Sequence, residues 1–406
     1  MKASGLRNRA ILAVLVAETV STTGSQMTWL ALPWFVLATT GSAVQMGIVL
    51  AAEAAGVALC GIPGGAVSAR LGARRTMLVV NAAAAPLILS VPLLHWAGVL
   101  SFGLLVAIVF VLGGLWSPYF AAQRVVLPEI LGEDEARVSD ANALLQAATR
   151  VTMVLGPVLA GVLIGVIGAP SVLIVDAVTF AFALTAIALF VPAAARPAET
   201  EESRGVLVGL RYLACDRLLR AWTLTIAVGD AAWNALFAAI PFYAFTQYDG
   251  NPRVAGLLLG CFGVSAVVGN VLSFRIRPRV EPRLLIAVGV LAQAAPLWLL
   301  AAAGPAWVVA LALLLAGLAN GIVNPSLHAM LTLALPPAVR AQALTAFISV
   351  NQLASPAGFL GAGFVLAHYG LGPIFLAVPV IQTLAMGGRA VATLRDRRLT
   401  PRVAPA

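Results

Sequence analysis

Apolar runs of 20 or more residues recur along the whole chain, separated by short polar or glycine- and proline-rich breaks. A helix of about 20 apolar residues spans roughly 30 Å of hydrocarbon, and a chain in lipid must pair its backbone groups within each segment. Strand-like alternation is absent from the pattern. The pattern therefore predicts twelve membrane-spanning helices, near residues 10–37, 45–69, 76–97, 99–123, 141–167, 171–193, 221–247, 254–274, 284–303, 306–332, 341–367 and 372–393.

The longest interior break divides six predicted helices from six. It begins with the polar run 196–204 and continues as GVLVGLRYLACDRLLR, whose amphipathic pattern is typical of a helix at a membrane surface. We therefore predict three parts: a six-helix half over residues 1–193, a cytoplasmic linker with an amphipathic helix over 194–220, and a second six-helix half over 221–406.

The two halves also show a weak internal repeat. A shift of 205 residues places glycine, serine and arginine on like residues: Gly64, Ser68, Arg70 and Arg74 fall on Gly269, Ser273, Arg275 and Arg279. A parallel duplication of a six-helix unit leaves such a pattern. Chance matching of apolar, low-complexity sequence is the alternative interpretation.

Composition and charge agree with a multi-pass membrane protein. The chain is 61% hydrophobic and 10% charged, a balance that excludes ordinary soluble domains. If the N-terminus is cytoplasmic, 23 of the 25 basic residues fall in cytoplasmic segments, Arg253 falls in an outside loop, and Arg150 falls within a span. The positive-inside rule then predicts a cell-membrane protein with both termini in the cytoplasm. The net charge of +9 does not indicate nucleic-acid binding, because the arginines occupy membrane loops.

Several kinds of chemistry are excluded by missing residues. The only lysine is Lys2, so the chain cannot build a phosphate loop of the ATPase type. The three cysteines and three histidines are widely spaced, and no hydrolase or metalloprotease motif occurs. We therefore expect no enzymatic activity, no metal and no cofactor, with the proton gradient as the energy source.

Residues 64–77 read GGAVSARLGARRTM and place three arginines between two predicted spans. This stretch resembles the loop signature of the major facilitator superfamily, roughly G-x-x-a-D-R-x-G-r-R, at Gly65, Arg70, Gly72, Arg74 and Arg75. The family's aspartate falls on Ala69 here. The resemblance implies that a salt-bridge partner which helps to latch the cytoplasmic side is missing.

Residues 116–164 contain Pro118, Pro128, the run Ala141-Asn142-Ala143, and Gly156-Pro157 in this order. In this the stretch is similar to the drug-exporter branch that includes macrolide efflux proteins and the enterobactin exporter. Gly156, Pro157 and Gly161 also resemble the fifth-helix signature of antiporters. Ordinary helix packing by glycine and proline is the alternative. The resemblance implies an all-α fold of two pseudo-symmetric six-helix bundles and proton-coupled export by alternating access.

Ionisable residues inside predicted spans are the first candidates for function, because charge in hydrocarbon is costly. There are five: Glu18, Glu53, Arg150, Asp176 and Asp230. The four acids are candidates for proton coupling, since a carboxylate removed from water takes up a proton more readily. A structural, hydrogen-bonded role is the alternative for each acid and is favoured for Asp176, near the outer end of its helix. The excess of acids over Arg150 favours neutral lipophilic or cationic cargo.

Polar stripes on some helices suggest a water-filled cavity. The candidate lining residues share helical spacing or an aromatic ring suited to stacking: Ser21, Ser25, Trp29, Asn142, Gln146, Arg150, Asn234, Asn320, Asn324 and Gln352. Hydrogen bonding between helices is the alternative for any single residue.

The sequence as a whole predicts a monomeric secondary transporter in the lipid bilayer. It would export a small amphipathic, drug-like or natural-product compound in exchange for protons. An importer or a uniporter of a small solute is the alternative within transport, and a membrane enzyme or a receptor is the alternative outside it.

Overall fold

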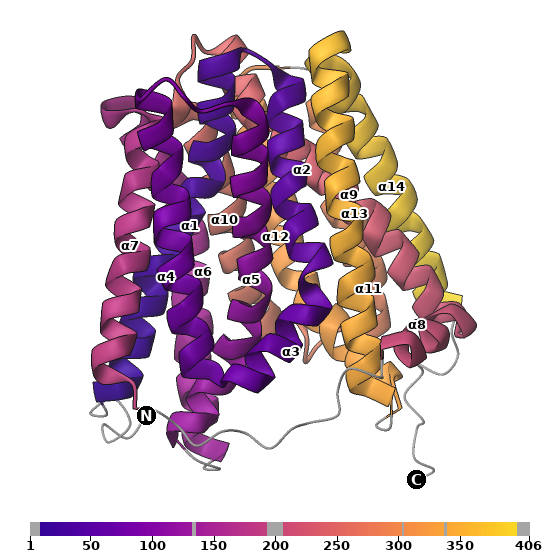
Figure 1. The fold of residues 1–406 in the computed structure, drawn as a ribbon. Helices are drawn as coiled ribbons and strands as arrows, with labels where there is room; N and C mark the ends of the chain where they lie inside the picture. The colour runs from indigo at the N-terminus through magenta and orange to yellow at the C-terminus, as the bar shows by residue number, and fades with distance from the viewer. Residues whose placement is uncertain (1–8, 132–134, 193–205, 303, 337–338, 396–406) are drawn as a thin grey trace. The chain divides into compact units, whose positions relative to one another are not determined.

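The computed structural model describes residues 9–131, 135–192, 206–302, 304–336 and 339–395, and every regular element in these ranges is a helix. Figure 1 follows the helices from α1 in indigo to α14 in yellow. Their bounds are α1 Arg9–Thr40, α2 Ala43–Leu59, α3 Gly61–Leu71, α4 Ala73–Trp96, α5 Phe102–Leu131, α6 Glu135–Ile167, α7 Ala169–Phe190, α8 Val206–Cys215, α9 Arg217–Gln247, α10 Pro252–Ile276, α11 Pro282–Ala294, η2 Ala295–Ala302, α12 Ala306–Ala334, α13 Arg340–Tyr369 and α14 Leu371–Arg395.

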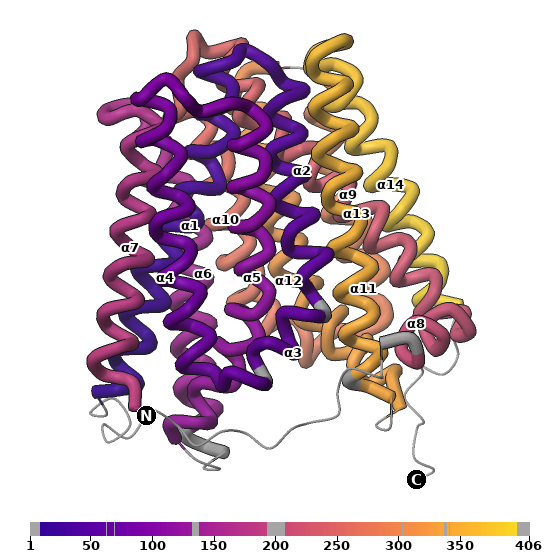
Figure 2. Tube along the Cα trace, in the orientation of Figure 1, coloured from indigo at the N-terminus to yellow at the C-terminus, as the bar shows by residue number. Residues whose placement is uncertain are grey.

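Each predicted span corresponds to a helix or to a broken pair. The second span is not continuous as predicted: it ends as α2 at Leu59 and resumes as α3 at Gly61, and Figure 2 shows the change of direction. Pro63 explains the break, because proline has no N–H to donate to the carbonyl of Leu59 and its ring crowds that carbonyl. Pro296 has the same effect in the ninth span, where α11 gives way to the 3₁₀ helix η2.

Ten of the described segments are long and apolar enough to cross a membrane: α4, α5, α6, α7, α9, α10, α11 with η2, α12, α13 and α14. α2 is apolar but has only 17 residues before the break. α1 is long enough at 32 residues but is not among those ten, because Glu18 and the serines and threonines near it lower the hydropathy of its central stretch. The first span therefore carries more polar groups than its neighbours.

The chain separates into two compact units. Unit 1 contains Met1–Ser203 and Ile240–Leu257, and unit 2 contains Arg204–Ala239 and Leu258–Ala406. Ile240–Leu257 groups with unit 1 because the first turns of α10 pack closely on α6, where a Cβ atom on Gly256 would lie 2.5 Å from the carbonyl oxygen of Pro157. This grouping is based on packing alone. It does not test the predicted division at residues 193 and 221, which stays a prediction.

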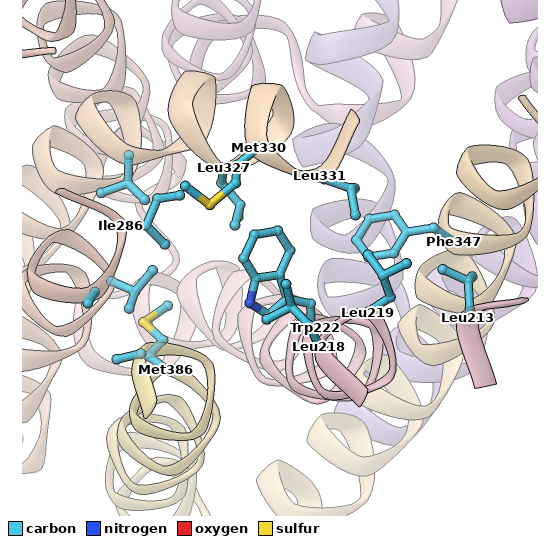
Figure 3. Packing of buried hydrophobic residues seen from close by; sticks show 14 of the residues in the cluster. Leu213, Leu218, Leu219, Trp222, Ile286, Leu327, Met330, Leu331, Phe347 and Met386 are labelled. Carbon is cyan, nitrogen blue, oxygen red and sulfur yellow. The ribbon is translucent and has the colours of Figure 1, made fainter. Parts of the chain in front are cut away.

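The core of unit 2 is built around the indole of Trp222 on α9. Trp222 is fully buried, and its Nε1 donates to Thr393 Oγ1 of α14 at 3.1 Å. Figure 3 shows Leu327 and Met330 of α12 over the ring. The amphipathic stretch predicted for the membrane surface forms α8, and its apolar side packs on protein: Leu213 belongs to this core, and Gly209 lies against the backbone of α13.

Glycines bring helix backbones into direct contact in both units. In unit 1 a Cβ atom on Gly113 of α5 would overlap the carbonyl oxygen of Glu53 on α2, and one on Gly56 would overlap the carbonyl oxygen of Phe110. In unit 2 a Cβ atom on Gly321 of α12 would overlap the carbonyl oxygen of Ala266 on α10. Small residues are what allows helices to approach this closely in lipid.

The internal repeat has a structural counterpart at its first glycine. Gly64 lies against Ser117 and Pro118 of α5, and Gly269 lies against Leu318 and Gly321 of α12. Both glycines thus serve a contact between the second and fourth spans of their own half. This shared role favours duplication over chance matching at these positions.

In unit 2 the arginine that contacts the end of the last helix is not the one that the sequence repeat aligns with Arg74. Arg74, at the start of α4, donates to the carbonyl oxygens of Ala188 and Val191 at the end of α7, at 2.9 and 2.6 Å. In unit 2 the matching contact comes from Arg283 at the start of α11, which donates to the carbonyl of Leu394 at 2.7 Å. Arg279, the sequence match to Arg74, bonds within its own helix end.

The rest of the loop signature has mixed structural roles. Gly72 joins α3 to α4 with φ +80°, a backbone conformation that a side chain disfavours. Arg70 and Arg75 are exposed, and a Cβ atom on Gly65 would meet only open space. The side chain of Ala69 lies outside the described part, so its replacement of the family's aspartate stays without a structural account.

We predict that Gly113→Ala destabilises the protein by about 1–3 kcal/mol, because the new methyl group overlaps the backbone of α2. Thermal unfolding of the purified protein measures the effect. Gly103→Ala is the matched control, since Gly103 lies on the same helix and a Cβ atom there meets nothing within 4 Å. Equal unfolding temperatures for the two variants would contradict the close contact.

We predict that Arg74→Gln destabilises unit 1 by about 1–2 kcal/mol, because the carbonyls at the end of α7 lose two charged hydrogen-bond donors at a partly exposed site. Arg75→Gln removes the same charge from the next, exposed position and is expected to leave the unfolding temperature unchanged. If both variants unfold at the same temperature, the bonds of Arg74 do not stabilise the helix end.

Candidate functional site

Glu18 on α1 is almost completely buried, with 1% of its surface exposed. Its Oε1 accepts a hydrogen bond from the hydroxyl of Tyr119 at 2.6 Å, and its Oε2 accepts one from Nε2 of Gln123 at 2.6 Å. Both donors lie on α5 at spacing four, so they sit on one face of that helix. Within the part of the chain that the structure describes, no basic side chain forms an ion pair with Glu18.

The two partners of Glu18 suit a group that changes its protonation state. A tyrosine hydroxyl donates and accepts, and a glutamine carboxamide carries both an N–H₂ donor and a carbonyl acceptor. Two donors satisfy the carboxylate as it stands. If Glu18 takes up a proton, rotation of either partner provides an acceptor for the new O–H. The site can therefore satisfy both states of the acid without a cation.

The ring of Tyr119 also lines a small apolar hollow in unit 1. The hollow lies among α4, α5 and α7, and its walls are Val80, Ala84, Leu112, Leu115, Trp116, Tyr119 and Phe180. Trp116 meets the ring of Tyr119 edge to face at 6.1 Å. One residue thus connects an apolar, aromatic surface to the buried carboxylate.

Asp176 on α7 is the second buried acid of unit 1, with 2% of its surface exposed. Thr28 of α1 donates to its Oδ2 at 2.6 Å, and Thr179 donates to its Oδ1 at 3.1 Å. Gly24 makes room for this group, since a Cβ atom there would lie 2.5 Å from Asp176 Oδ1. The bonds of Asp176 join α7 to α1, as the structural alternative requires.

Glu53 on α2 is half-buried and lies within electrostatic range of Asp176. Its backbone carbonyl is the group that contacts Gly113 of α5. The close packing of α2 on α5 therefore positions this residue.

Asp230 on α9 is half-buried in unit 2, and its surroundings differ from those of Glu18. Two cationic or potentially cationic groups act on its charge, Arg389 of α14 and His328 of α12. No direct ion pair joins Asp230 to Arg389, although both residues belong to the described ranges. Asp230 thus has a countercharge nearby that Glu18 lacks.

Arg389 is a functional candidate that the sequence analysis missed. It is counted above with the cytoplasmic arginines, yet only 6% of its surface is exposed. The intramembrane charges are therefore four acids against two arginines, which weakens the argument for cationic cargo from charge alone. Arg389 lies within the predicted twelfth span and at i+7 from Gln382, and this spacing is the signal that could have identified it.

The remaining cavity candidates fall into two groups. Some are held by hydrogen bonds within their own helix: Asn324 Nδ2 donates to Asn320 Oδ1 at 2.9 Å, and Ser25 donates to the carbonyl of buried Ser21 at 3.1 Å. The others differ in exposure: Trp29, Asn142 and Asn234 are half-buried, and Gln146, Arg150 and Gln352 are exposed. Their role as cavity lining stays a prediction.

The glycine and proline signature of the fifth span is a packing element of α6. A Cβ atom on Gly156 would clash with the side chain of Gln26 on α1. Gly161 faces the start of α10, where its Cβ atom would lie 2.8 Å from the carbonyl oxygen of Pro252. These contacts leave no room for a side chain at 156 or 161, and this agrees with the packing alternative. A conformational role for the element stays a prediction.

The partners of the buried acids were also missed. These partners are Tyr119, Gln123, Thr28 and Thr179, and no pattern in the sequence marks Tyr119, Gln123 or Thr179. Thr28 alone had a signal, since it continues the polar face of Ser21 and Ser25 at helical spacing. Across the described ranges, no three His, Cys, Asp or Glu side chains gather as metal ligands would.

Comparisons with known proteins find relatives over nearly the whole chain. The chain is 25% identical over 401 residues to the multidrug efflux pump Tap of Mycobacterium tuberculosis, covering 96% of this chain and 94% of that protein. It is 26% identical over 405 residues to the multidrug efflux pump Tap of Mycolicibacterium fortuitum, with 96% and 97% covered.

Solved structures share the fold at low sequence identity. The crystal structure of the nucleoside transporter NupG superposes with a TM-score of 0.73 at 13% identity, covering 96% of this chain and 100% of that chain. A POT family transporter in complex with 5-aminolevulinic acid gives 0.75 at 12% identity, with 97% of each chain covered. The sequence model of the Major Facilitator Superfamily matches residues 14–359 and 231–405, and the chain therefore belongs to this superfamily.

Proposed function

We propose that this protein exports a small amphipathic compound across the cell membrane in exchange for protons, and that Glu18 carries the proton. The observation that carries the proposal is the setting of Glu18: a carboxylate with 1% exposure, two neutral hydrogen-bond partners at 2.6 Å and no ion pair within the described residues. The names of the curated relatives, multidrug efflux pumps of bacteria, support export as the direction and drug-like molecules as the cargo.

Charge in hydrocarbon explains how such a site couples two flows. When the site opens to the outside, Glu18 takes up a proton and becomes neutral, so the protein reorients at low electrostatic cost. When it opens to the cytoplasm, Glu18 releases the proton and the carboxylate favours cargo that carries positive charge or hydrogen-bond donors. Reorientation with an empty, charged site is unfavourable, and this penalty makes each proton entry accompany one export step.

The same reasoning gives the rest of the proposal. The proton gradient is the energy source, and neither a cofactor nor a metal takes part. Both termini face the cytoplasm, as the distribution of arginines predicts, and the protein acts as a monomer. The small aromatic hollow beside Tyr119 offers apolar contacts close to the acid.

We predict that Glu18→Gln abolishes proton-driven export. The glutamine is isosteric, and the Tyr119 hydroxyl and the Gln123 amide can still bond to its oxygen, but it cannot exchange a proton at neutral pH. Export of ethidium from proteoliposomes with an imposed pH gradient is expected to fall to the level of empty liposomes, while ethidium binding to the detergent-solubilised protein is retained.

Glu281→Gln is the matched control, because Glu281 is an exposed acid before the first turn of α11 and the chemical change is the same. It is expected to transport as the parent protein does. Gradient-driven export by Glu18→Gln at the parent rate would remove Glu18 from the mechanism. Ethidium flux that ignores the pH gradient in the parent protein would instead favour a uniporter.

We predict that Tyr119→Phe slows gradient-driven export about tenfold, because the carboxylate loses one of its two hydrogen-bond donors and releases its proton less readily. Proton uptake into the same proteoliposomes, followed with a pH-sensitive dye, is the measurement. Trp116→Phe is the control for the hollow, since it changes the apolar surface and leaves the bonds to Glu18 in place. A rate for Tyr119→Phe within twofold of the parent would contradict a role for the hydroxyl.

A further inference from the structure

Arg389 presents a buried hydrogen-bond donor, its Nε–H, that no group in the described part of the protein accepts. Only 6% of its surface is exposed, and its Nε is fully buried without a hydrogen-bond partner. A guanidinium has five N–H donors in a fixed plane and stays charged. A buried arginine with open donors is costly in a membrane protein unless a ligand or water meets them.

Gln382, two turns earlier on α14, presents the complementary group. It is fully buried, and its Nε2 donates to the backbone carbonyl of Gly229 on α9 at 2.7 Å. Because a backbone carbonyl only accepts, the amide nitrogen must face Gly229 and the amide oxygen must point elsewhere. That oxygen, Oε1, is buried and has no donor. One open acceptor and one open donor therefore lie on the same face of one helix.

Glycine at position 229 leaves room for about one methyl-sized group beside Gln382 and Arg389. The point that a Cβ atom on Gly229 would occupy is 3.4 Å from Gln382 Oε1 and 3.7 Å from Arg389 Nη2. These are ordinary van der Waals distances, so an alanine would fit and would fill this space. The next residue along α9 is Asp230, whose carboxylate interacts with Arg389 without a direct ion pair.

The charges and open hydrogen bonds together define the class of ligand. Asp230 and Arg389 balance one another, so an added anion or cation would leave a net charge in a site of low polarity. The open Nε–H needs an acceptor and the open Oε1 needs a donor. A hydroxyl group or an amide supplies both in one neutral group.

We propose that Gly229, Asp230, Gln382 and Arg389 form a subsite of unit 2 that binds a neutral hydroxyl or amide group of the exported compound. The proposal rests on the proposed function for its ligand, because the group belongs to the cargo. It assigns Arg389 and Gln382 to cargo recognition, with Asp230 within electrostatic range of Arg389. Proton exchange remains with Glu18, which has no such countercharge.

A chemical protection experiment on the purified full-length protein tests the subsite without a proton gradient. Glyoxal modifies accessible guanidinium groups, and mass spectrometry of the digested protein reports modification of Arg389, with exposed Arg395 of the same helix as the internal reference. Three probes share one carbon skeleton and differ in charge: isobutyramide, isobutyrate and isobutylammonium.

We expect isobutyramide to slow modification of Arg389 about fivefold, as about 80% occupancy gives by mass action, and to leave Arg395 unaffected. The charged probes should change neither rate by more than about a tenth at the same concentration. Gly229→Ala should keep the unfolding temperature of the parent and lose the protection by isobutyramide, because the methyl group fills the subsite.

The other outcomes overturn the proposal. Modification of Arg389 at one rate with every probe would mean that the gap holds water only, and no modification while Arg395 reacts would mean that the site is sealed. Protection by isobutyrate or isobutylammonium in preference to the amide would contradict the neutral class. Loss of coupling in the Glu18 experiments leaves this result unchanged, since no gradient is used, and the two proposals therefore fail separately.

Discussion

A carboxylate buried among apolar helices must be hydrogen-bonded, and this requirement organises unit 1. Glu18 of α1 reaches Tyr119 and Gln123 of α5, and Asp176 of α7 reaches Thr28 of α1. These bonds hold α1 to two different helices at two levels. If either acid lost its donors, a buried polar group would remain without a hydrogen-bond partner, at a cost of several kcal/mol. The polar stripe of α1 is also what gives this helix specific neighbours.

Backbone contact through glycine is the second constraint. Apolar side chains alone do not distinguish a neighbouring helix from lipid, because both are equally apolar. Glycine at 56 and 113 in unit 1, and at 269 and 321 in unit 2, lets the backbones of paired helices touch and fixes their register. The terminal arginines Arg74 and Arg283 then secure the ends of the last helix of each half. Both kinds of contact occur in each half, and they are the structural counterpart of the weak sequence repeat.

The two units satisfy their buried acids in different ways, and this difference suggests a division of roles. In unit 1 the partners of Glu18 are neutral groups that can donate or accept, so a proton can come and go. In unit 2 Asp230 lies within electrostatic range of Arg389, a countercharge that Glu18 lacks. A transporter that exchanges protons for cargo needs one group that changes charge and another that recognises the cargo. Separate placement of the two functions would let cargo vary while the coupling stays the same.

The sequence by itself determined the twelve spans, the family and the positions of the four intramembrane acids. The reason is that a membrane span requires a long apolar segment. A charged residue inside such a segment can therefore be recognised from one sequence. Its errors were local. Pro63 and Pro296 interrupt two spans that the hydropathy pattern predicts as continuous, because hydropathy does not register the loss of a backbone donor.

Only the tertiary structure decided which groups meet these acids. Tyr119 is 101 residues from Glu18, and Thr28 is 148 residues from Asp176. No spacing along one chain predicts such pairs, since they depend on how helices rotate against each other. Arg389 shows the same limit. An arginine near a helix end can extend to the membrane surface or turn inward, and the sequence around it does not distinguish the two orientations. Packing of α14 against the rest of unit 2 buried this one, and a buried charge is what makes it a candidate for function.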